Sequence, residues 1–530
     1  MVEQSQHVQR IARSGGLNVV GALVGAVTGF GVTAALTNWL APDVAGTIFA
    51  TTSLFLIATA VTQIGTESGM VRWLPAKLAT GREQDVRAVL AVGLLPVVLV
   101  SSVVAAVLVL AAPAVAELVV GGAHVDAVAD QVRVLALFLP VAATFNVVLA
   151  ATRGLRTMRP TILLESIGRS LLQLLVVVGV ISLGASSPVV VLAWAGPYAL
   201  ALVLAGLWLG LLLRRVTRRG AARAADPEVE ASPAAAPEAG GSVAGQFWRY
   251  TAPRAVSTMA QTLLKRSDVV LVAALRSPAE AALYAAASRF VTLGQVGVQA
   301  LQQALGPQLS AMFASQQHDE ALEVYRLTTA WSIMMAWPVY IASAVLAPTL
   351  ILVFGNGYSE GATVVVVLSA AMLVAVASGS VDTVMLMSGR SLLSLANVLV
   401  TLVVNVALNL LLIPPLGIEG AAIAWAVAIV VRNVLPLVQV RSALGMTPAS
   451  PATWLVGSAA LGCFAVVPGT LALLGVSAVW VFAALVLGGL VYVAVLVRAR
   501  EMLELSALVR ALRRGRRGGP RGMRSPSVQD

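Results

Sequence analysis

The 530-residue sequence is poor in the residues that build metal, redox and disulfide sites. Its single cysteine, Cys463, lies in an apolar run, which excludes an intrachain disulfide, a thiolate zinc site and an iron–sulfur cluster. The three histidines, His7, His124 and His318, fall in predicted connections or near the N-terminus. We therefore expect no metal site and no cofactor.

Charge is also scarce. Charged residues make up only 11% of the chain, hydrophobic residues make up 58%, and the mean hydropathy is +0.90, which a water-soluble globular domain of this size would not tolerate. The formal net charge of +11 would suggest nucleic acid in a soluble chain, but here the arginines cluster between apolar runs and near the C-terminus. We expect them to act as topology signals and to contact membrane lipids, with no nucleic-acid partner.

Two further absences argue against an enzyme. The sequence contains no GxxxxGK[ST] phosphate-binding loop, so direct use of ATP is not expected. The longest predicted extracytoplasmic connection, residues 113–130, is too short for a soluble catalytic domain. The first apolar run is a full span with no small-residue cleavage site after it, so no signal peptide is expected to be removed.

Long apolar runs dominate what is present. A helix of about 20 residues crosses a hydrocarbon core roughly 30 Å thick, and about 14 runs meet that length. The sequence therefore predicts an all-α, polytopic membrane protein. The predicted spans cover residues 16–40, 45–68, 88–112, 131–152, 160–184, 188–213, 250–275, 279–305, 327–354, 362–387, 391–414, 419–441, 452–476 and 478–498.

The connections between these spans alternate in charge. One set is rich in arginine and lysine, and the other carries Asp43, Glu117, Asp126 and further acids with few cations. Because short cytoplasmic loops carry the positive excess, both termini are predicted to be cytoplasmic, in a bacterial cytoplasmic membrane. The basic connections hold Arg10, Arg13, Lys77, Arg82, Arg87, Arg153, Arg156, Arg159, Arg214, Arg215, Arg218, Arg219, Arg223, Arg326, Arg390 and Arg441.

The composition changes to Arg, Ala, Pro and Glu after the sixth span, which predicts a flexible cytoplasmic linker. Seven arginines between residues 510 and 524 predict a basic tail against the anionic inner leaflet. Two six-helix lobes plus two C-terminal helices result. The predicted division is an N-lobe at 1–213, the linker at 214–249, a C-lobe at 250–445, spans 13 and 14 at 446–500, and the tail at 501–530.

The segments before and after the linker repeat with an offset of 236 positions. This offset places Pro42 on Pro278, Ala45 on Ala281 and Gln63 on Gln299. Six spans separate equivalent points, so both copies would insert in the same orientation, related by an axis along the membrane normal. Two matching lobes around a central cavity are typical of a transporter, although a static scaffold could also retain such a repeat.

Residues 250–275 form an apolar span with an unusual polar stripe. The stripe residues follow one another at steps of three and four, so they share one helix face: Arg254, Thr258, Gln261, Lys265 and Asp268. A charge near the middle of a span costs about 3 kcal/mol or more, so this face is expected to meet protein or water and not lipid. In the alternative interpretation, Lys265 and Asp268 neutralise each other and only join two helices.

Further polar side chains extend this predicted lining. Arg266 leaves the stripe net positive, which suggests an anionic ligand, and Arg289, Gln295 and Gln299 share a face of the next span with Thr292 and Gln302. Amides at this spacing suit sugar hydroxyls or a headgroup, and hydrogen bonds between helices explain any single glutamine equally well.

Active transport needs a driving force, and carboxylates inside the membrane could supply it by titrating. Asp268, Asp382 and Glu165 are the candidate coupling groups, beside Glu67. Glu165 precedes Arg169 by four residues, which predicts an ion pair along one helix with a mainly structural role.

Three segments resemble a known family: NWLAPDVAGTIFATTSLF from Asn38, SPAEAALYAAASRF from Ser277, and NVLVTLVVNVALNLLLIPPLGIEGAAIAWAVA from Asn397. Together with Asp268, they resemble the Wzx-type flippases of polysaccharide biosynthesis, in the superfamily that includes multidrug exporters and lipid II flippases. The resemblance implies a flippase for an undecaprenyl-pyrophosphate-linked oligosaccharide that associates with glycan-assembly enzymes. Its diphosphate would be held by Arg254, Lys265, Arg266 and Arg289.

Three alternatives remain at this point. A lipid II flippase would be expected to carry basic residues in its first two spans, whereas this chain has none between Arg13 and Arg72. A multidrug exporter for cationic compounds fits poorly with a positive stripe. A membrane glycan polymerase or ligase would generally present a larger external loop with catalytic residues.

Overall fold

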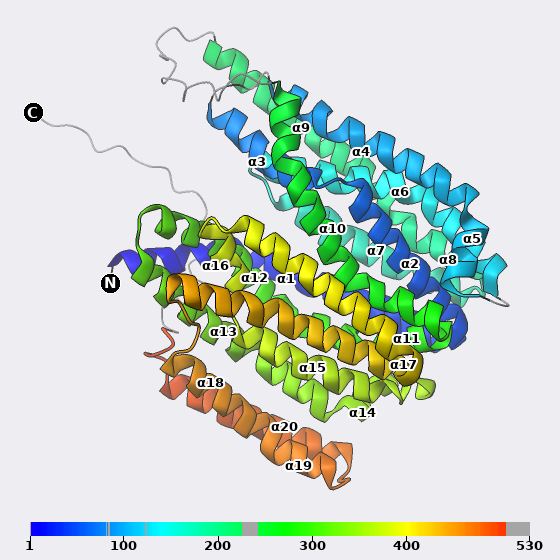
Figure 1. Ribbon diagram of the computed structural model, residues 1–530, viewed down its shortest axis with the longest axis vertical. Helices are drawn as coiled ribbons and strands as arrows, with labels where there is room; N and C mark the ends of the chain where they lie inside the picture. The colour runs from blue at the N-terminus through cyan, green and yellow to red at the C-terminus, as the bar shows by residue number, and fades with distance from the viewer. Residues whose placement is uncertain (1, 81, 83–84, 122–123, 225–241, 505–530) are drawn as a thin grey trace, which may run out of the picture.

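The computed structural model describes residues 2–80, 82, 85–121, 124–224 and 242–504 (Figure 1). Every regular element in these ranges is a helix, which confirms the all-α fold. Residues 225–241 of the predicted linker and the predicted basic tail beyond residue 504 lie outside the described residues, whereas the two ends of the predicted linker belong to helices.

The part of the chain before residue 225 forms ten helical elements among the described residues. They are α1 Val2–Trp39, α2 Pro42–Thr62, α3 Thr66–Ala79, α4 Asp85–Leu110, α5 Ala112–Val119, α6 Val125–Gly154, the π-helix η2 Thr161–Arg169, α7 Ser170–Ser182, α8 Ser187–Ala195 and α9 Pro197–Ala224. Helix α9 continues past residue 213, where the sixth span was predicted to end, because the following arginines and alanines favour a helix.

The described part of the chain after residue 241 is built from helices as well. Its elements are α10 Val243–Leu275, α11 Pro278–Ala287, α12 Arg289–Ala314, α13 His318–Val345, α14 Ala347–Leu350, the 3₁₀ turns η3 Ile351–Phe354 and η4 Asn356–Tyr358, α15 Gly361–Ala377, α16 Val381–Met387, α17 Ser391–Leu444, α18 Pro451–Leu461, the π-turn η5 Gly462–Val466, α19 Val467–Leu473 and α20 Ala478–Arg498.

Ten of the described helices are long and apolar enough to cross a membrane, or eleven if the bent pair from His318 to Phe354 is one span. Helix α17 counts once although it is 54 residues long, and the charged helix α10 is not among them. The protein is therefore a polytopic membrane protein, and the count of about 14 spans stays a prediction.

Helix α17 bends sharply where the sequence predicted a gap between two spans. Gly417 has φ 58° and ψ −134°, a conformation that favours glycine, and it follows Pro414 and Pro415, which cannot donate backbone hydrogen bonds. A Cβ atom at this position would lie 2.8 Å from Glu280 Oε2. The bend therefore divides α17 into two segments.

The helices before and after residues 225–241 meet along the middle of the bundle. In Figure 1, α4, α6 and α9 lie on one side, and α13, α15 and α18–α20 lie on the other. Helix α2 packs on α10 and α11, α1 packs on both α7 and α12, and α10 packs on α17. The described chain begins and ends at the same end of the bundle (Figure 1).

The opposite end of this central interface is tightly closed. Gly46 near the start of α2 lies against the carbonyl group of Pro278, and Asn38 donates to the Val353 carbonyl over 2.8 Å. Beneath them, the rings of Phe30, Phe290 and Phe354 form a cluster with centroid separations of 4.8–5.8 Å. Helices from both parts of the chain therefore seal this end.

Candidate functional site

A cavity of about 570 Å³ lies at the central interface, below the phenylalanine cluster. Side chains from α1, α2, η2, α7, α8 and α9 line it from one side, and side chains from α10, α11, α12, α15 and α17 line it from the other. We call this space the central chamber. Its volume lies within the range of about 300–1,000 Å³ that is common for small-molecule sites.

The chamber is strongly positive. Five cations and two carboxylates line it, a formal excess of three positive charges. Such charges repel one another more strongly in the low dielectric of a membrane protein than in water. The cations are Arg169, Lys265, Arg266, Arg289 and Arg432, and the carboxylates are Glu165 and Asp268.

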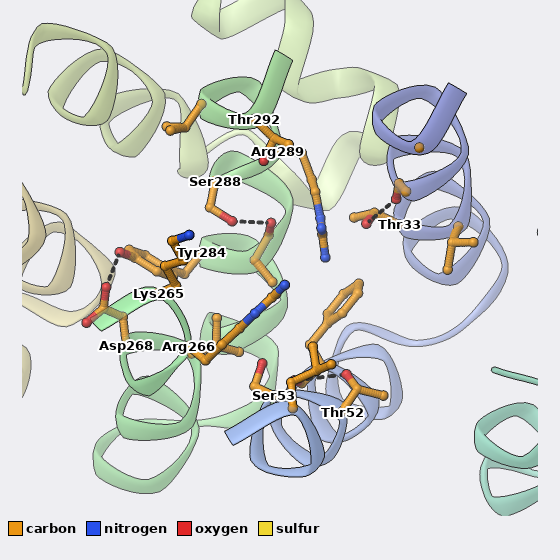
Figure 2. A pocket seen from close by; sticks show the side chains of 18 of the residues that line it. Thr33, Thr52, Ser53, Lys265, Arg266, Asp268, Tyr284, Ser288, Arg289 and Thr292 are labelled. Carbon is orange, nitrogen blue, oxygen red and sulfur yellow. Dashed lines mark hydrogen bonds between the residues drawn. The ribbon is translucent and has the colours of Figure 1, made fainter. Parts of the chain in front are cut away.

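Two arginines from different helices point into the chamber. Figure 2 shows Arg266 from α10 and Arg289 from α12 reaching into the same space. Helix α11 ends before Ser288, so Arg289 occupies the first position of a new helix. Its Nε atom is buried and has no hydrogen-bond partner. A buried donor without a partner costs free energy. A ligand that accepts a hydrogen bond from Arg289 Nε would remove this cost.

Four of the five cations form no ion pair in the described part of the chain, although Asp382 lies close enough to Arg432 to act on its charge. The five ion pairs found there do not involve Lys265, Arg266, Arg289 or Arg432. Arg432 and Arg266 lie close enough to Lys265 to act on its charge. An anion in the chamber would remove this mutual repulsion.

Asp268 does not neutralise Lys265. Asp268 is only 3% exposed, and its carboxylate accepts a hydrogen bond from the Tyr284 hydroxyl at 3.1 Å (Figure 2). The carboxylate also accepts from Asn409 Nδ2 at 2.8 Å. The alternative in which Lys265 and Asp268 form a pair is therefore not what the structure contains. Asp268 instead links α10 to α11 and to α17.

The fifth cation, Arg169, has a counter-ion, although its buried Nε atom, like that of Arg289, has no hydrogen-bond partner. It pairs with Glu165 over 3.5 Å, donates to Gln173 Oε1 over 3.2 Å, and lies 4.5 Å above the Tyr198 ring. The predicted pair of Glu165 and Arg169 is confirmed. Both residues belong to the π-helix η2, a type of turn that is frequent at functional sites.

The rest of the wall consists of neutral polar groups. Gln299 donates to Gln295 Oε1 over 3.3 Å on the α12 side. Hydroxyl groups line the α1 and α2 side, and a hydroxyl that donates to its own helix can still accept a hydrogen bond. These hydroxyl residues are Thr28, Thr33, Thr52 and Ser53.

The chamber collects most of the candidate site residues. Its lining includes Glu165, Lys265, Arg266, Asp268, Arg289, Gln295 and Gln299. Three described candidates lie elsewhere: Arg254 stands 5.7 Å from the Tyr250 ring centroid, Gln261 donates to Ser257 Oγ at 3.3 Å, and Asp382 accepts from Ser394 Oγ at 2.6 Å. A helix of 33 residues is about 50 Å long, so a stripe along α10 extends beyond the chamber.

Sequence reasoning missed several residues of the chamber, among them Arg432 and Tyr284. Arg432 stands alone in an apolar span with no acid within a turn, a signal that could have identified it. Tyr284 lies among alanines, and only the fold shows that its hydroxyl meets Asp268. In the described ranges, no group of three or more His, Cys, Asp or Glu side chains could hold a metal ion.

Solved structures with a similar fold are membrane transporters. The lipid II flippase MurJ in an inward closed conformation is 11% identical, with a TM-score of 0.66 over 92% of this chain and 99% of that chain. A variant of the MATE transporter VcmN from Vibrio cholerae is 14% identical, with a TM-score of 0.59 over 86% of this chain and 100% of that chain. At these identities the likeness shows the fold alone.

A transporter of the MOP superfamily from Pyrococcus furiosus, described as having a binding pocket of reversed polarity, is also 14% identical. Its TM-score is 0.56, and the match covers 84% of this chain and 99% of that chain. No curated protein matches this sequence. Residues 11–313 match the polysaccharide biosynthesis protein family. This match covers more than half of the chain, and the chain therefore belongs to the polysaccharide biosynthesis protein family, with the fold of the solved MurJ and MATE transporters.

Proposed function

We propose that the protein is a flippase that moves a polyprenyl-diphosphate-linked oligosaccharide across the bacterial cytoplasmic membrane for cell-surface polysaccharide biosynthesis. The observation that carries this proposal is the group of cations without ion pairs in the central chamber, with a buried and unpartnered Nε atom on Arg289. A diphosphate carries several negative charges, and planar guanidinium groups bind phosphate oxygens through two parallel hydrogen bonds.

In this proposal, the chamber binds the two polar parts of the substrate, the diphosphate and the sugars. Lys265, Arg266 and Arg289 would hold the diphosphate, with Arg432 as a fourth cation. Gln295 and Gln299, together with the hydroxyl groups of α1 and α2, would hydrogen-bond sugar hydroxyls. The polyprenyl chain would stay in the lipid, where its apolar surface costs least.

Translocation would follow an alternating-access cycle. The contact between Gly46 and Pro278 seals one end of the interface, and rocking of the two lobes about the chamber would open this end and close the other. With both termini cytoplasmic, the sealed end would face outward. The predicted lobes, residues 1–213 and 250–445, are the moving parts of this proposal.

Asp268 is the proposed coupling carboxylate. It joins three helices at the edge of the chamber, so a change in its charge would alter the contacts of α10 with α11 and α17. Glu165 is already neutralised by Arg169, and Asp382 bonds Ser394 outside the chamber, so neither is placed as favourably.

The rival functions differ in the ligand. A lipid II flippase would use the same diphosphate chemistry, and the similarity to MurJ favours it as the second candidate, but no lysine or arginine of α1 or α2 lines this chamber. An exporter of cationic drugs would have to bind a positively charged ligand in a chamber that is itself net positive, and the two would repel each other. A glycan polymerase or ligase would need catalytic residues, and we propose none: the chain would receive its lipid-linked substrate from glycan-assembly enzymes.

The test replaces Arg266 and Arg289 by glutamine, singly and together, in cells that depend on this protein for surface glycan. Each charge-assisted hydrogen bond contributes about 1.5–3 kcal/mol, so each single variant should reduce export by roughly tenfold to a hundredfold and the double variant should abolish it. Arg133→Gln is the control, because Arg133 is an exposed cation outside the chamber. Normal surface glycan with the double variant, at equal protein level, would contradict the proposal.

A further inference from the structure

A second cluster of cations lies outside the chamber, where α3 meets α10. The guanidinium carbon of Arg72 lies 4.1 Å from the centroid of the Tyr250 ring, and that of Arg254 lies 5.7 Å from the same centroid. Arg72 is exposed, whereas Tyr250 and Arg254 are half-buried. Two positively charged side chains from different helices therefore share one aromatic ring.

Neither arginine has a counter-ion among the residues that the structure describes. Helix α10 has no acidic residue between its start at Val243 and Ser267. The carboxylate of α3, Glu67, is held by Arg153 at 2.9 Å. One arginine on a tyrosine is a common stabilising contact, but a second one beside it adds repulsion. An anion between the two guanidinium groups would relieve this repulsion.

The backbone fixes this cluster firmly. The left-handed Gly65 before α3 lies against Ala255, and Gly69 lies against Phe247 and Thr251, so α3 and α10 approach closely one turn from Arg72. Trp248 and Phe247 stack edge to face beside Tyr250. The ring and the two guanidinium groups are therefore presented by packed helices and not by a loose loop.

The cluster and the chamber lie along the same face of α10. Tyr250, Arg254, Gln261 and Lys265 fall on one face of α10 by helical spacing. Arg254 precedes Lys265 by eleven residues, or about 16 Å along the helix. On the predicted topology, the Arg254 end of α10 is cytoplasmic, where a substrate made in the cytoplasm would arrive.

We propose that Arg72, Tyr250 and Arg254 form an outer anion site, which binds the phosphate groups of the lipid-linked substrate before they reach the chamber. This inference rests on the proposed function. The substrate would thus bind at two cationic sites in sequence, first where α3 meets α10 and then in the chamber. The polar face of α10 extends from the outer cluster to the chamber.

The first experiment uses purified full-length protein in phosphatidylcholine nanodiscs and a fluorescent short-chain polyprenyl diphosphate as the probe. In a protein that carries Arg266→Gln and Arg289→Gln, weak residual binding should remain at the outer site. Adding Arg72→Gln should weaken this binding about tenfold or more, because one charge-assisted phosphate contact is lost. Arg249→Gln is the matched control. Arg249 is exposed and directly precedes Tyr250 in α10, but it is not one of the two arginines that lie over the Tyr250 ring.

The second experiment measures transport in proteoliposomes. Arg72→Gln alone should raise the half-saturating substrate density about tenfold and leave the maximal rate unchanged, because the chamber is intact. Tyr250→Phe should behave as the wild type, whereas Tyr250→Ala should resemble Arg72→Gln, since the ring and not its hydroxyl positions the arginines.

Three results would overturn the outer site. They are equal binding by the Arg72→Gln and Arg249→Gln proteins, displacement of the probe by phosphatidylglycerol as readily as by unlabelled polyprenyl diphosphate, and a fall in maximal rate without a change in half-saturation. The first would remove the site, the second would assign it to ordinary phospholipid headgroups, and the third would place Arg72 in the transport step. If the chamber variants export normally, the proposed function fails, whereas these binding measurements still decide the outer site.

Discussion

The two halves of the central chamber are built on one plan but present different chemistry. The offset of 236 positions that relates Pro42 to Pro278, each in the first turn of its helix, also places Thr52 on Ser288 and Ser53 on Arg289. All four of these polar residues line the chamber (Figure 2). The same offset places Val32 of α1 on Asp268 of α10, and both face the chamber.

The difference lies in the backbone as well as in the side chains. Helix α2 runs through Ser53 without interruption, whereas its counterpart stops at Ser288 and restarts at Arg289. Because a new helix begins at Arg289, its guanidinium points into the chamber, whereas the equivalent position of the first half, Ser53, carries a small hydroxyl group. The net positive charge of the chamber thus lies in the second half, whereas the first half contributes the Glu165–Arg169 ion pair and neutral hydrogen-bonding groups. This polarity would orient a substrate that is anionic at one end and a sugar at the other.

The largest effect on this comparison is expected from Asp268→Asn, which leaves the second half with no carboxylate in the chamber while the packing is kept. If Asp268 couples transport to an ion or proton gradient, net accumulation driven by a gradient should be lost. Exchange of labelled for unlabelled substrate, which needs no gradient, should persist. The measurement compares both fluxes in proteoliposomes, and a variant that still accumulates substrate would show that the coupling group lies elsewhere.

Exchanging the equivalent residues tests whether the position of the charge matters. A protein with Ser53→Arg and Arg289→Ser keeps the net charge of the chamber but moves one cation to the first half. Export should fall by about tenfold to a hundredfold, as for Arg289→Gln, because the diphosphate loses a directed contact. Recovery to the level of the wild type would mean that total charge, and not its location, holds the substrate.

A smaller effect is expected at the closed end, where the two copies also differ. Gly46 corresponds to Ala282 by the same offset, and a Cβ atom on Gly46 would overlap the backbone of Pro278. Gly46→Ala should therefore loosen this seal, lower the thermal stability and reduce export several-fold. Labelling of a Ser277→Cys protein that lacks Cys463 by a membrane-impermeant maleimide should increase. Gly206→Ala on α9 is the matched control, because no atom lies within 4 Å of its added Cβ and Gly206 does not line the chamber.

The smallest effect is expected from the hydroxyl side. Ser53→Ala removes one neutral hydrogen-bonding group, which is worth about 0.5–1.5 kcal/mol, so export should fall by roughly twofold to tenfold. Affinity for a sugar-free polyprenyl diphosphate should not change. A loss of affinity for that probe would show that the first half also contacts the diphosphate and would weaken the assigned polarity.

Much of the fold followed from local patterns. Apolar length predicted the spans, and the sequence from Pro414 to Gly417 predicted the bend in α17. The interruptions at Gln63–Gly65, Ser288 and Ser378–Ser380 were not predicted, since their flanking residues are compatible with continuous helix. In these places tertiary packing outweighs local helix propensity.

The site was predicted in part for a related reason. Helical periodicity identified one face of α10 and found Lys265 and Asp268, but it gave no depth along the helix, so Arg254 and Gln261 were grouped with them. In the structure the first half of α10 packs on α3, and only its second half reaches the chamber. Arg432 joins the site from α17. Its isolation in an apolar span marks it as a charge that avoids lipid, but no local pattern shows that it lies near Lys265.

The sequence by itself determined that this chain is a helical membrane protein with charges that cannot face lipid, because apolar length and the cost of buried charge depend only on composition and spacing. It also determined the family, through segments that carry the resemblance. Only the tertiary structure decided which charges meet. Periodicity orients a side chain about its own helix axis, whereas the packing of eleven helical elements decides that four unpaired cations share a chamber and that Asp268 turns to Tyr284 and Asn409.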